Sequence, residues 1–299
     1  MIDRPAVESG PQADRLATRF AECAAADRAA LVTFVTAGDP DLDRMPQVLA
    51  ALVAGGADII EIGMPFTDPM ADGPVIQAGN IRSLRSGTTL RGVLAAVTAF
   101  RAINATTPLI LMGYFNPVLA FGPARFAAEA AAAGLDGAIV VDLPPEEDVE
   151  LTPHLAHHGL HTIRLATPTT DAARLPTVVS GASGFVYYVA VAGITGAGSG
   201  EAGDIAAAVT RLKAATPLPV AVGFGIRTPA QAAAIAIHAD AVVVGSAIVS
   251  LIGAAAEARA NDLPEQIEAF VRSLADAVHN ARRAEAIGGD PNALRSVAA

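Results

Sequence analysis

The amino-acid sequence predicts an α/β protein, a single (β/α)8 TIM barrel with an extra helix before the barrel and a helical tail after it. Two observations lead to this prediction. Eight short runs rich in β-branched residues are each followed by an alanine-rich segment of helical length. The runs are continuously apolar rather than alternating, which is typical of parallel strands that helices cover on both faces.

The elements follow one another from the N-terminal side. A helix is expected over residues 13–25, because Leu16, Phe20 and Cys23 recur at helical spacing. The eight strands are predicted in the segments LVTFVTAGDP, DIIEIG, PLILMGY, GAIVVDLP, HTIRLATP, GFVYYVAV, LPVAVGFG and DAVVVGSA. Each connection is long enough for the right-handed helical crossover that parallel strands require.

All 299 residues are expected to form one domain, residues 1–299, with residues 1–12 and about 281–299 flexible. Between Leu31 and Ile252 nothing resembles a linker or a break in composition. Eight units could also form an open, doubly wound sheet. The unbroken repeat favours the barrel.

Composition and charge limit the classes of function. The chain is 52% hydrophobic and 17% charged, which is ample for a large core. The formal net charge of -10 argues against a sequence-independent grip on nucleic acid. The first thirty residues contain five acidic residues and no uninterrupted apolar core, so neither a secretory signal nor a membrane span is predicted. We therefore expect a cytoplasmic protein without a nucleic-acid or membrane partner.

The strongest candidates for chemistry are carboxylic acids at the C-terminal ends of strands, where such barrels build their active sites. Glu61 lies between Ile60 and Ile62 in the second strand, so its carboxyl either faces the barrel mouth or is buried at a large cost. Apolar surroundings would raise its pKa and suit it to proton transfer. The loop GMPFTDPMADGP follows, and we expect its Asp72 to be a fixed anion beside that proton shuttle. The alternative is that the loop acids Asp68 and Asp72 are solvated and cap the next helix.

Three glycine-bearing turns follow the sixth, seventh and eighth strands, in AGITGAGSG, GFGIRTP and GSAIV. Backbone N–H groups of such turns, with a helix N-terminus after the eighth strand, can bind a phosphate. We therefore expect a phosphorylated substrate that contacts Gly196, Gly225, Gly245 and Ser246. The alternative is that these glycines only permit tight turns.

Two other patterns predict no cofactor and no metal. The GxG within GITGAGSG lacks the acidic residue at the end of a strand that dinucleotide binding requires. The histidines of HLAHHGLH, residues 154–161, fall near the N-terminal face of the barrel and form no HExxH pattern. We interpret them as surface histidines.

Several segments together resemble the tryptophan synthase α chain family. They are, in order, FVTAGDPDL, IIEIGMPFTDPMADGPVIQ, LMGYFNPVL, VVDLPPEE, GFVYYVAVAGITG, VGFGIRTPAQ and GSAIV, and they span Leu31 to about Ile252. The second is the most specific, because both acids, the prolines and the following Ile-Gln agree together. The resemblance implies a carbon–carbon lyase that cleaves indole-3-glycerol phosphate to indole and glyceraldehyde 3-phosphate, with no cofactor in this chain.

The resemblance also implies roles for individual residues. Glu61 matches the acid–base catalyst of the family, and Asp72 would stabilise the charge that develops on the indole N–H. Tyr187 matches an active-site tyrosine, and Phe34 would line the indole pocket. Thr195 matches the threonine of a mobile sixth loop that closes over the substrate and pairs with Asp72.

A partner is implied as well. Pro65, Asp68 and the neighbouring NPV turn resemble regions through which the family's α chain meets a β chain that carries pyridoxal phosphate. The implied assembly is an α2β2 heterotetramer, in which the β chain receives indole and makes L-tryptophan. Two positions depart from the pattern: Ala190 where many relatives have serine, and Gly79 where a larger small residue is common. These departures concern loop dynamics more than chemistry.

Three rival functions remain open at this point. A stand-alone lyase of the same fold would have the same acids but need no partner. A non-catalytic barrel would bind a phosphometabolite and only regulate another protein. A nicotinamide oxidoreductase is the third rival.

Overall fold

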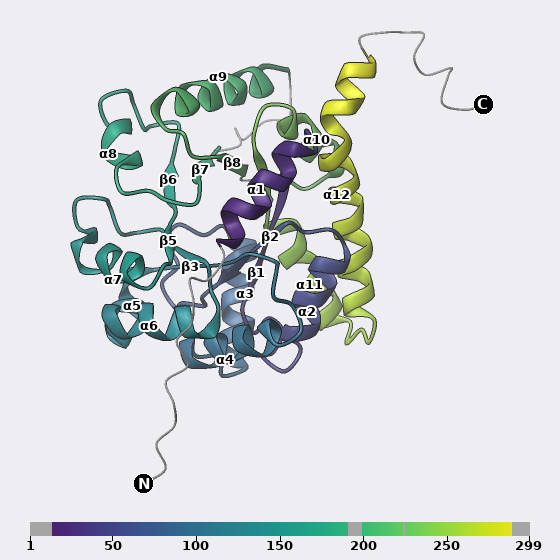
Figure 1. Ribbon diagram of the computed structural model, residues 1–299. Helices are drawn as coiled ribbons and strands as arrows, with labels where there is room; N and C mark the ends of the chain where they lie inside the picture. Colours follow the sequence, from purple (N-terminus) through teal and green to yellow (C-terminus); the bar gives the residue numbers. More distant parts are fainter. Residues whose placement is uncertain (1–13, 191–198, 224, 289–299) are drawn as a thin grey trace.

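Parallel strands form a sheet that closes almost completely into a barrel (Figure 1). The computed structural model describes residues 14–190, 199–223 and 225–288. Across these residues the strands are β1 Ala30–Thr36, β2 Ile59–Gly63, β3 Leu109–Gly113, β4 Gly137–Val140, β5 His161–Thr162, β6 Arg164–Ala166, β7 Val186–Val189, β8 Val220–Gly223 and β9 Ala241–Val244. Their spatial order is β5-β4-β3-β2-β1-β9-β8-β7-β6. The predicted barrel of parallel strands is confirmed.

The fifth predicted strand is divided into β5 and β6, which only Ile163 separates. The first piece pairs with β4 through Gly137 and His161, and the second pairs with β7 through Arg164 and Val186. One chain segment therefore bonds to one neighbour with its first half and to the other neighbour with its second half. This exchange explains why nine strands stand where eight were predicted.

Helices cover the outside of the barrel. Within the described residues they are α1 Arg15–Ala25, α2 Met45–Ala54, α3 Pro74–Arg85, α4 Leu90–Arg101, α5 Phe115–Phe121, α6 Pro123–Ala133, the 3-10 turn η1 Asp148–Glu150, α7 Thr152–His157, α8 Leu175–Val179, α9 Ser199–Ala215, α10 Pro229–Ala236, α11 Ser246–Glu257 and α12 Leu263–Gly288. Local signals set several of their starts. In α10, for example, the N-cap residue Thr228 forms a reciprocal capping box with Gln231, and Pro229 is the first helical residue. None of the helices in these ranges is both long and apolar enough to cross a membrane.

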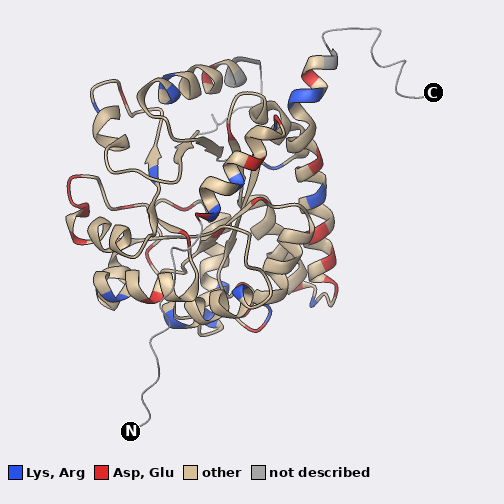
Figure 2. Ribbon diagram, viewed as in Figure 1, with Lys and Arg blue, Asp and Glu red and all other residues tan. Residues whose placement is uncertain are grey.

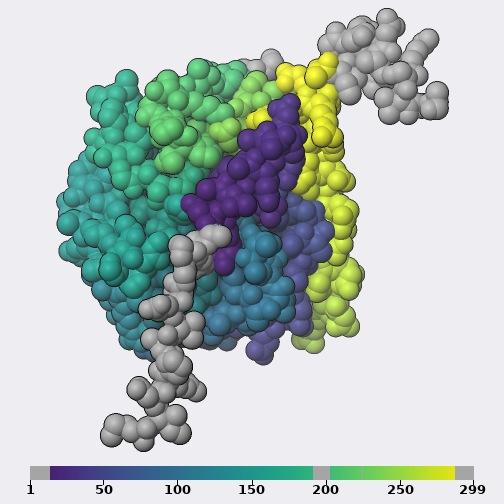
Figure 3. Space-filling model, in the orientation of Figure 1, coloured from purple at the N-terminus to yellow at the C-terminus, as the bar shows by residue number. Residues whose placement is uncertain are grey.

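Helix α1 is the predicted extra helix, and it lies across the N-terminal end of the barrel (Figures 1 and 3). Leu16, Phe20 and Cys23 are buried in one apolar cluster with inward-facing strand residues. Arg15 and Arg19 of the same helix pair with aspartates that precede β4 and β2. The helix therefore closes the end of the barrel opposite to the predicted active site.

Helix α12 packs against α2 and α10 along one side of the barrel (Figure 1). It continues through residues 281–288, the first part of the C-terminal segment that we expected to be flexible. The rest of that segment, like residues 1–12, lies outside the described residues. Charged side chains gather on such outer helices and on loops (Figure 2).

Side chains along each strand alternate between the barrel interior and the layer under the helices. The inward cluster includes Val32, Ile59, Ile110, Ile139 and Ile163, whereas neighbours such as Leu31, Ile60 and Leu111 face the helices. Both faces are buried, so the sequence reads as continuously apolar. Counting by twos from Val32 and Ile59 places Phe34 and Glu61 inside the barrel, nearer to its C-terminal end.

Candidate active site

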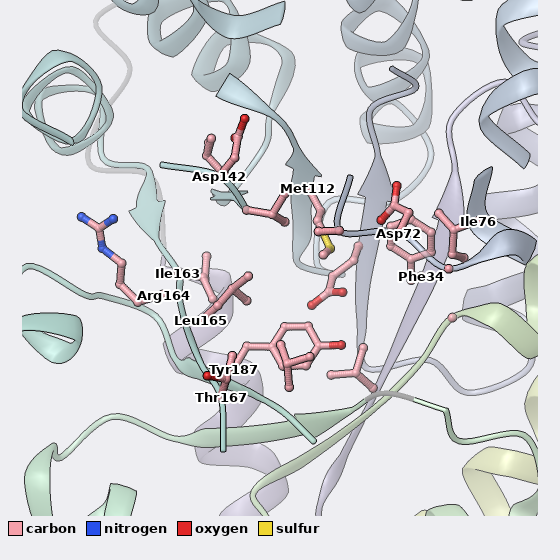
Figure 4. Close-up of a pocket in the computed structure, with 18 of the residues that line it drawn as sticks. Phe34, Asp72, Ile76, Met112, Asp142, Ile163, Arg164, Leu165, Thr167 and Tyr187 are labelled. Carbon is pink, nitrogen blue, oxygen red and sulfur yellow. The ribbon is translucent and has the colours of Figure 1, made fainter. Parts of the chain in front are cut away.

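A cavity of about 1200 Å³ lies at the C-terminal ends of the strands (Figure 4). It brings together seven residues predicted from the sequence: Phe34, Glu61, Asp72, Tyr187, Gly225, Gly245 and Ser246. Two further candidates, Thr195 and Gly196, lie outside the described residues. The cavity is elongated, with Asp72 and Phe34 on one side and Asp142 and Arg164 on the other (Figure 4).

Glu61 has the most unusual environment in this cavity. The parallel register sets it beside Phe34 on β1 and Ile110 on β3, and it is 0% exposed. Neither of its carboxyl oxygens has a hydrogen-bond partner among the described residues. Burial raises the pKa of Glu61 to about 8, so the carboxyl can hold a proton at neutral pH and also release it.

Tyr187 lies in the middle of β7 and turns its hydroxyl toward the centre of the cavity (Figure 4). Burial, and then the nearby charge of Glu61, raise the pKa of Tyr187 well above its ordinary value. The phenol is therefore a neutral hydrogen-bonding group. A Cβ atom at Gly223 of β8 would come within 2.7 Å of the Tyr187 hydroxyl oxygen. A glycine at that position gives the phenol its space.

Asp72 lies in the loop between β2 and α3, two residues before the helix begins. Its Oδ2 accepts a hydrogen bond of 3.1 Å from Nδ2 of Asn80. Burial raises the pKa of Asp72, and hydrogen bonding to Asn80 and to the hydroxyl of Tyr114 opposes that rise. Burial therefore acts on Asp72 as it does on Glu61, but Asp72 has donors that favour its charged form. The sequence pointed to neither Asn80 nor Tyr114.

Phe34 forms an apolar wall together with residues that the sequence did not single out. Cβ atoms at Gly63 and Gly245 would come within 2.4 Å and 3.1 Å of Phe34 carbon atoms, so two glycines make room for this ring. Met112 of β3 and Leu165 of β6 also line the cavity. Each lies two residues after an inward-facing residue of its strand, Ile110 or Ile163, and this alternation is the signal that could have identified both.

The predicted phosphate turns meet at another part of the cavity. Gly225 has a φ of 75°, a backbone conformation that favours glycine. Gly245 caps α11 and Ser246 is the first residue of this helix, so free backbone N–H groups of its first turn lie at the cavity. Arg227 also lines the cavity and brings a positive charge to the same end. Sequence reasoning missed Arg227, although it belongs to the GFGIRTP turn.

Pro65 and Asp68 occupy the loop after β2 but do not line the cavity. Pro65 is buried and Asp68 is exposed. Met70 in the same loop is 78% exposed, a large fraction for an apolar side chain. Phe66 packs its ring against Tyr114 at a centroid distance of 5.4 Å, which anchors the loop to the barrel. The loop thus has an inner side at Asp72 and an outer side at Asp68 and Met70.

The histidine-rich segment forms no metal site in the part of the chain that the structure describes. There, no group of three or more His, Cys, Asp and Glu side chains is arranged to hold a metal ion. His157 and His158 stack edge to face at the end of α7, and His161 pairs with Asp14 through a 3.1 Å contact. His154, His157 and His158 are exposed, as expected for surface histidines.

Gly79, one of the two departures noted in the sequence, has a packing explanation. A Cβ atom at this position of α3 would come within 2.9 Å of Thr36 Oγ1, 3.0 Å of Val249 Cγ1 and 3.1 Å of Asp39 Oδ2. The glycine lets α3 lie close to β1 and α11. For Ala190, nothing in the structure explains the departure.

These features define an enzyme of the (β/α)8-barrel class, whose cavity at the C-terminal ends of the strands contains the buried carboxyl of Glu61. The family model described as "Tryptophan synthase alpha chain" matches residues 20–279. The chain belongs to the tryptophan synthase alpha chain family.

Three relatives illustrate this similarity. The tryptophan synthase alpha chain of Rhizorhabdus wittichii is 60% identical over 264 residues, which are 87% of this chain and 97% of the relative. That of Erythrobacter litoralis is 56% identical over 265 residues, 89% of this chain and 100% of the relative. The crystal structure of tryptophan synthase subunit alpha from Legionella pneumophila superimposes with a TM-score of 0.83 at 39% identity, covering 89% of this chain and 99% of that one.

The activity implied by the sequence resemblance is confirmed. The protein is a carbon–carbon lyase of tryptophan biosynthesis that cleaves indole-3-glycerol phosphate to indole and glyceraldehyde 3-phosphate. Members of this family work with a β chain.

Proposed function

We propose that Glu61 is the acid–base catalyst of the cleavage. One observation carries this proposal: the carboxyl is fully buried, has no hydrogen-bond partner among the described residues, and has a pKa of about 8. A carboxyl near neutral pKa can give up and regain a proton in a single turnover. Its freedom from hydrogen bonds leaves both oxygens available to the substrate.

Glu61 alone can carry out both proton transfers that the reaction needs. Protonated Glu61 donates to the indole ring carbon that carries the glycerol chain. The carboxylate thus formed then accepts the proton of the adjacent chain hydroxyl. As that O–H bond breaks, its electrons form the aldehyde carbonyl, the bond between ring and chain breaks, and its electrons return to the ring. Glu61 ends the cycle protonated, so no net proton is consumed.

Asp72 and Phe34 act on the indole ring in this proposal. Protonation of the ring carbon makes the ring cationic, and a carboxylate beside the ring N–H stabilises that charge. Asp72 is the carboxylate with donors that favour its charged form. Phe34 and Met112 supply apolar surface for the ring. Tyr187, near Glu61, offers a neutral hydroxyl to the reacting chain.

The phosphate of the substrate is placed at the turns after β8 and β9. Backbone N–H groups at Gly225, Gly245 and Ser246 bind it, with support from the N-terminus of α11. The proposal retains Gly196 as a further phosphate contact and Thr195 as a partner of Asp72 in a closing loop. No metal and no cofactor in this chain is required.

The outer side of the loop after β2 is the proposed contact with the β chain. Asp68 is exposed there and Pro65 shapes the backbone, while Met70 adds an exposed apolar side chain. We place this chain in an α2β2 heterotetramer in the cytoplasm, with pyridoxal phosphate carried by the β chain. Indole would then pass between the active sites without entering the solvent.

The decisive experiment measures indole formation from indole-3-glycerol phosphate by the purified chain, with and without a β chain. Slow turnover that the β chain accelerates is expected for wild type. Glu61→Gln keeps the size of the side chain but cannot exchange the proton, so turnover should fall at least about a thousandfold. Near-normal turnover of Glu61→Gln would show that Glu61 is not the acid–base catalyst.

Two controls make this result interpretable. Binding of glycerol phosphate should be unchanged in Glu61→Gln, because the proposed phosphate turns lie elsewhere in the cavity. Replacing the exposed helix carboxyl of Glu285 by Gln should leave turnover unchanged. High turnover of the isolated wild-type chain, with no acceleration by the β chain, would instead indicate a stand-alone lyase.

A further inference from the structure

Two buried side chains outside the proposed catalytic set surround Asp72. Asn80, on α3, is 4% exposed and donates from Nδ2 to Asp72 Oδ2 over 3.1 Å. Tyr114, between β3 and α5, is 2% exposed, and its hydroxyl interacts with the same carboxylate. The two groups come from different parts of the barrel, so they fix Asp72 from two directions.

The hydroxyl of Tyr114 is set up to donate to Asp72. Its oxygen accepts a hydrogen bond of 3.1 Å from the backbone N–H of Ala71, which leaves its own proton available. Burial, and then the charge of Asp72, raise the pKa of Tyr114 to about 12, so the phenol keeps that proton throughout the working pH range. The ring of Phe66 packs on Tyr114 and holds it in place.

We propose that Asn80 and Tyr114 are positioning residues for Asp72, whose hydrogen bonds hold its carboxylate ionised and directed at the indole ring. This inference rests on the role proposed above for Asp72. Neither residue lines the cavity, so both act through Asp72 and not on the substrate.

Asp72 needs such support because of where it lies. Its loop, between β2 and α3, contains two prolines and forms neither helix nor strand, so no regular ladder of backbone hydrogen bonds fixes its position. Partial burial by itself favours the neutral form of a carboxyl, which could not stabilise a cationic ring. Donors on a helix and next to a strand end correct both problems, since they fix the rotamer and favour the charge.

The first test is the pH dependence of indole formation by Tyr114→Phe in the complex with the β chain. Loss of one hydrogen bond to a charged group should lower kcat about tenfold and change KM less than about threefold. The pKa of Asp72 should rise, so the acid limb of the kcat/KM profile should move to higher pH. Asn80→Ser, which shortens the donor side chain, should shift the profile in the same direction.

Tyr188→Phe is the matched control. Tyr188 is 6% exposed, and it packs in the cluster under α8 and α9 and not in the cavity. This variant removes a buried phenol hydroxyl without touching Asp72, so its profile should coincide with that of wild type. An unshifted acid limb in both Tyr114→Phe and Asn80→Ser would overturn the inference.

A double-mutant cycle separates positioning from a merely structural effect. In an Asp72→Asn background there is no carboxylate to hold, so adding Tyr114→Phe should cost little further turnover. An equal loss in both backgrounds would contradict the inference. Wild-type turnover of Asp72→Asn itself would remove the proposed role of Asp72 as well, whereas an impaired Asp72→Asn with an unimpaired Tyr114→Phe would remove this inference alone.

Discussion

At the scale of single residues, the clearest conflict between stability and function is at Glu61. A buried carboxyl without hydrogen bonds destabilises a fold, and a glutamine of the same size would avoid the charge. The strand around it is otherwise filled by residues such as Ile60 and Ile62, which pack without polar atoms. A residue that violates the local rule for a barrel interior in this way is expected at a functional site.

The stability of the chain should therefore depend on pH through Glu61. Its folded-state pKa of about 8 lies above the ordinary value of 4.5, so between these values the folded chain keeps a proton that the unfolded chain releases. The free energy of unfolding must fall as the pH rises through this window. Glu61→Gln has no proton to lose, so its Tm should exceed that of wild type by at least about 5 °C at about pH 9.

The measurement is a series of thermal unfolding curves of both chains from about pH 5 to about pH 9. The two Tm values should converge toward the acidic end, where Glu61 is protonated in the folded chain. Glu285→Gln, at an exposed carboxyl of α12, should follow wild type throughout. A constant difference between Glu61→Gln and wild type across this range would show that Glu61 is charged in the folded state.

At the scale of elements, α3 connects the catalytic loop with the rest of the barrel. It begins at Pro74, two residues after Asp72, and close packing against Thr36 of β1 and Val249 of α11 holds it in place at Gly79. An error in its position would move Asn80, which is the next residue. The glycine that looked like a departure in the sequence is therefore part of the geometry of the site.

Two glycine-to-alanine changes in helices should therefore have opposite effects on stability. Alanine in a helix interior normally stabilises by about 0.5–1 kcal/mol relative to glycine. Gly203→Ala in α9, where a Cβ atom would meet nothing within 4 Å, should show this gain. Gly79→Ala should instead destabilise by about 1–3 kcal/mol, because its Cβ would press on packed neighbours. Urea unfolding of both variants measures the difference, and a gain at Gly79 would contradict the packing explanation.

The sequence predicted the elements well because the signals for them are local. Apolar runs and the helical spacing of Leu16, Phe20 and Cys23 were enough to identify the strands and the extra helix. The break at Ile163 was not visible, since it arises from an exchange of neighbours between β4 and β7 and not from residue type. Met112 and Leu165 were missed because both faces of their strands are apolar, and only their alternation with Ile110 and Ile163 marks them as facing the barrel interior.

The sequence identified site residues whose type is unusual for their surroundings, but it did not identify residues whose role depends on contacts made only in the folded chain. Glu61 stood out because an acid in an apolar strand is rare, and the breaker-rich loop drew attention to Asp72. Asn80 looked like an ordinary polar helix residue, and Tyr114 like the end of a strand. Their importance comes from a meeting of α3, β3 and the loop after β2, which only the fold creates.

At the scale of the whole molecule, the two ends of the barrel use buried acids in opposite ways. At the N-terminal end, Asp58 and Asp136 are fully hydrogen-bonded by arginines and by backbone N–H groups. At the C-terminal end, Glu61 has no such partner within the described residues. One end therefore contributes stability, and the other holds reactive groups at a cost in stability.

At the N-terminal end of the barrel, Asp58 connects several elements that are far apart in the sequence. Its carboxylate bonds to Arg28 at 2.7 Å and 2.9 Å, to the N–H of Leu31 at 2.9 Å and to His279 at 2.8 Å. Arg19 of α1 approaches the same carboxylate at 3.3 Å. The first helix, the first two strands and the last helix thus meet at a single side chain. Loss of the charge on Asp58 should therefore destabilise the whole fold and not one element alone.

The acid sensitivity of the protein should therefore trace to Asp58. Burial alone would raise the pKa of Asp58, but hydrogen bonds from His279, Arg28 and the Leu31 N–H outweigh burial and lower it below the ordinary value of 3.8. A lowered pKa means that the stabilisation is complete above this value and is lost as the pH falls below it. Asp58→Asn leaves the half-buried Arg28 without its counter-charge and breaks the hydrogen bonds of a buried side chain, so the variant should unfold about 3–5 kcal/mol more easily near pH 7.

The difference in the free energy of unfolding between wild type and Asp58→Asn should also become smaller in acid. As the pH falls below 3.8, wild type loses the stabilisation that the variant never had. Urea unfolding at a series of pH values measures the gap, with Asp276→Asn, an exposed position on α12, as the control that should match wild type at every pH. A gap that stays constant down to about pH 2.5 would mean that Asp58 contributes through shape alone and that its charge does not join the helices to the barrel.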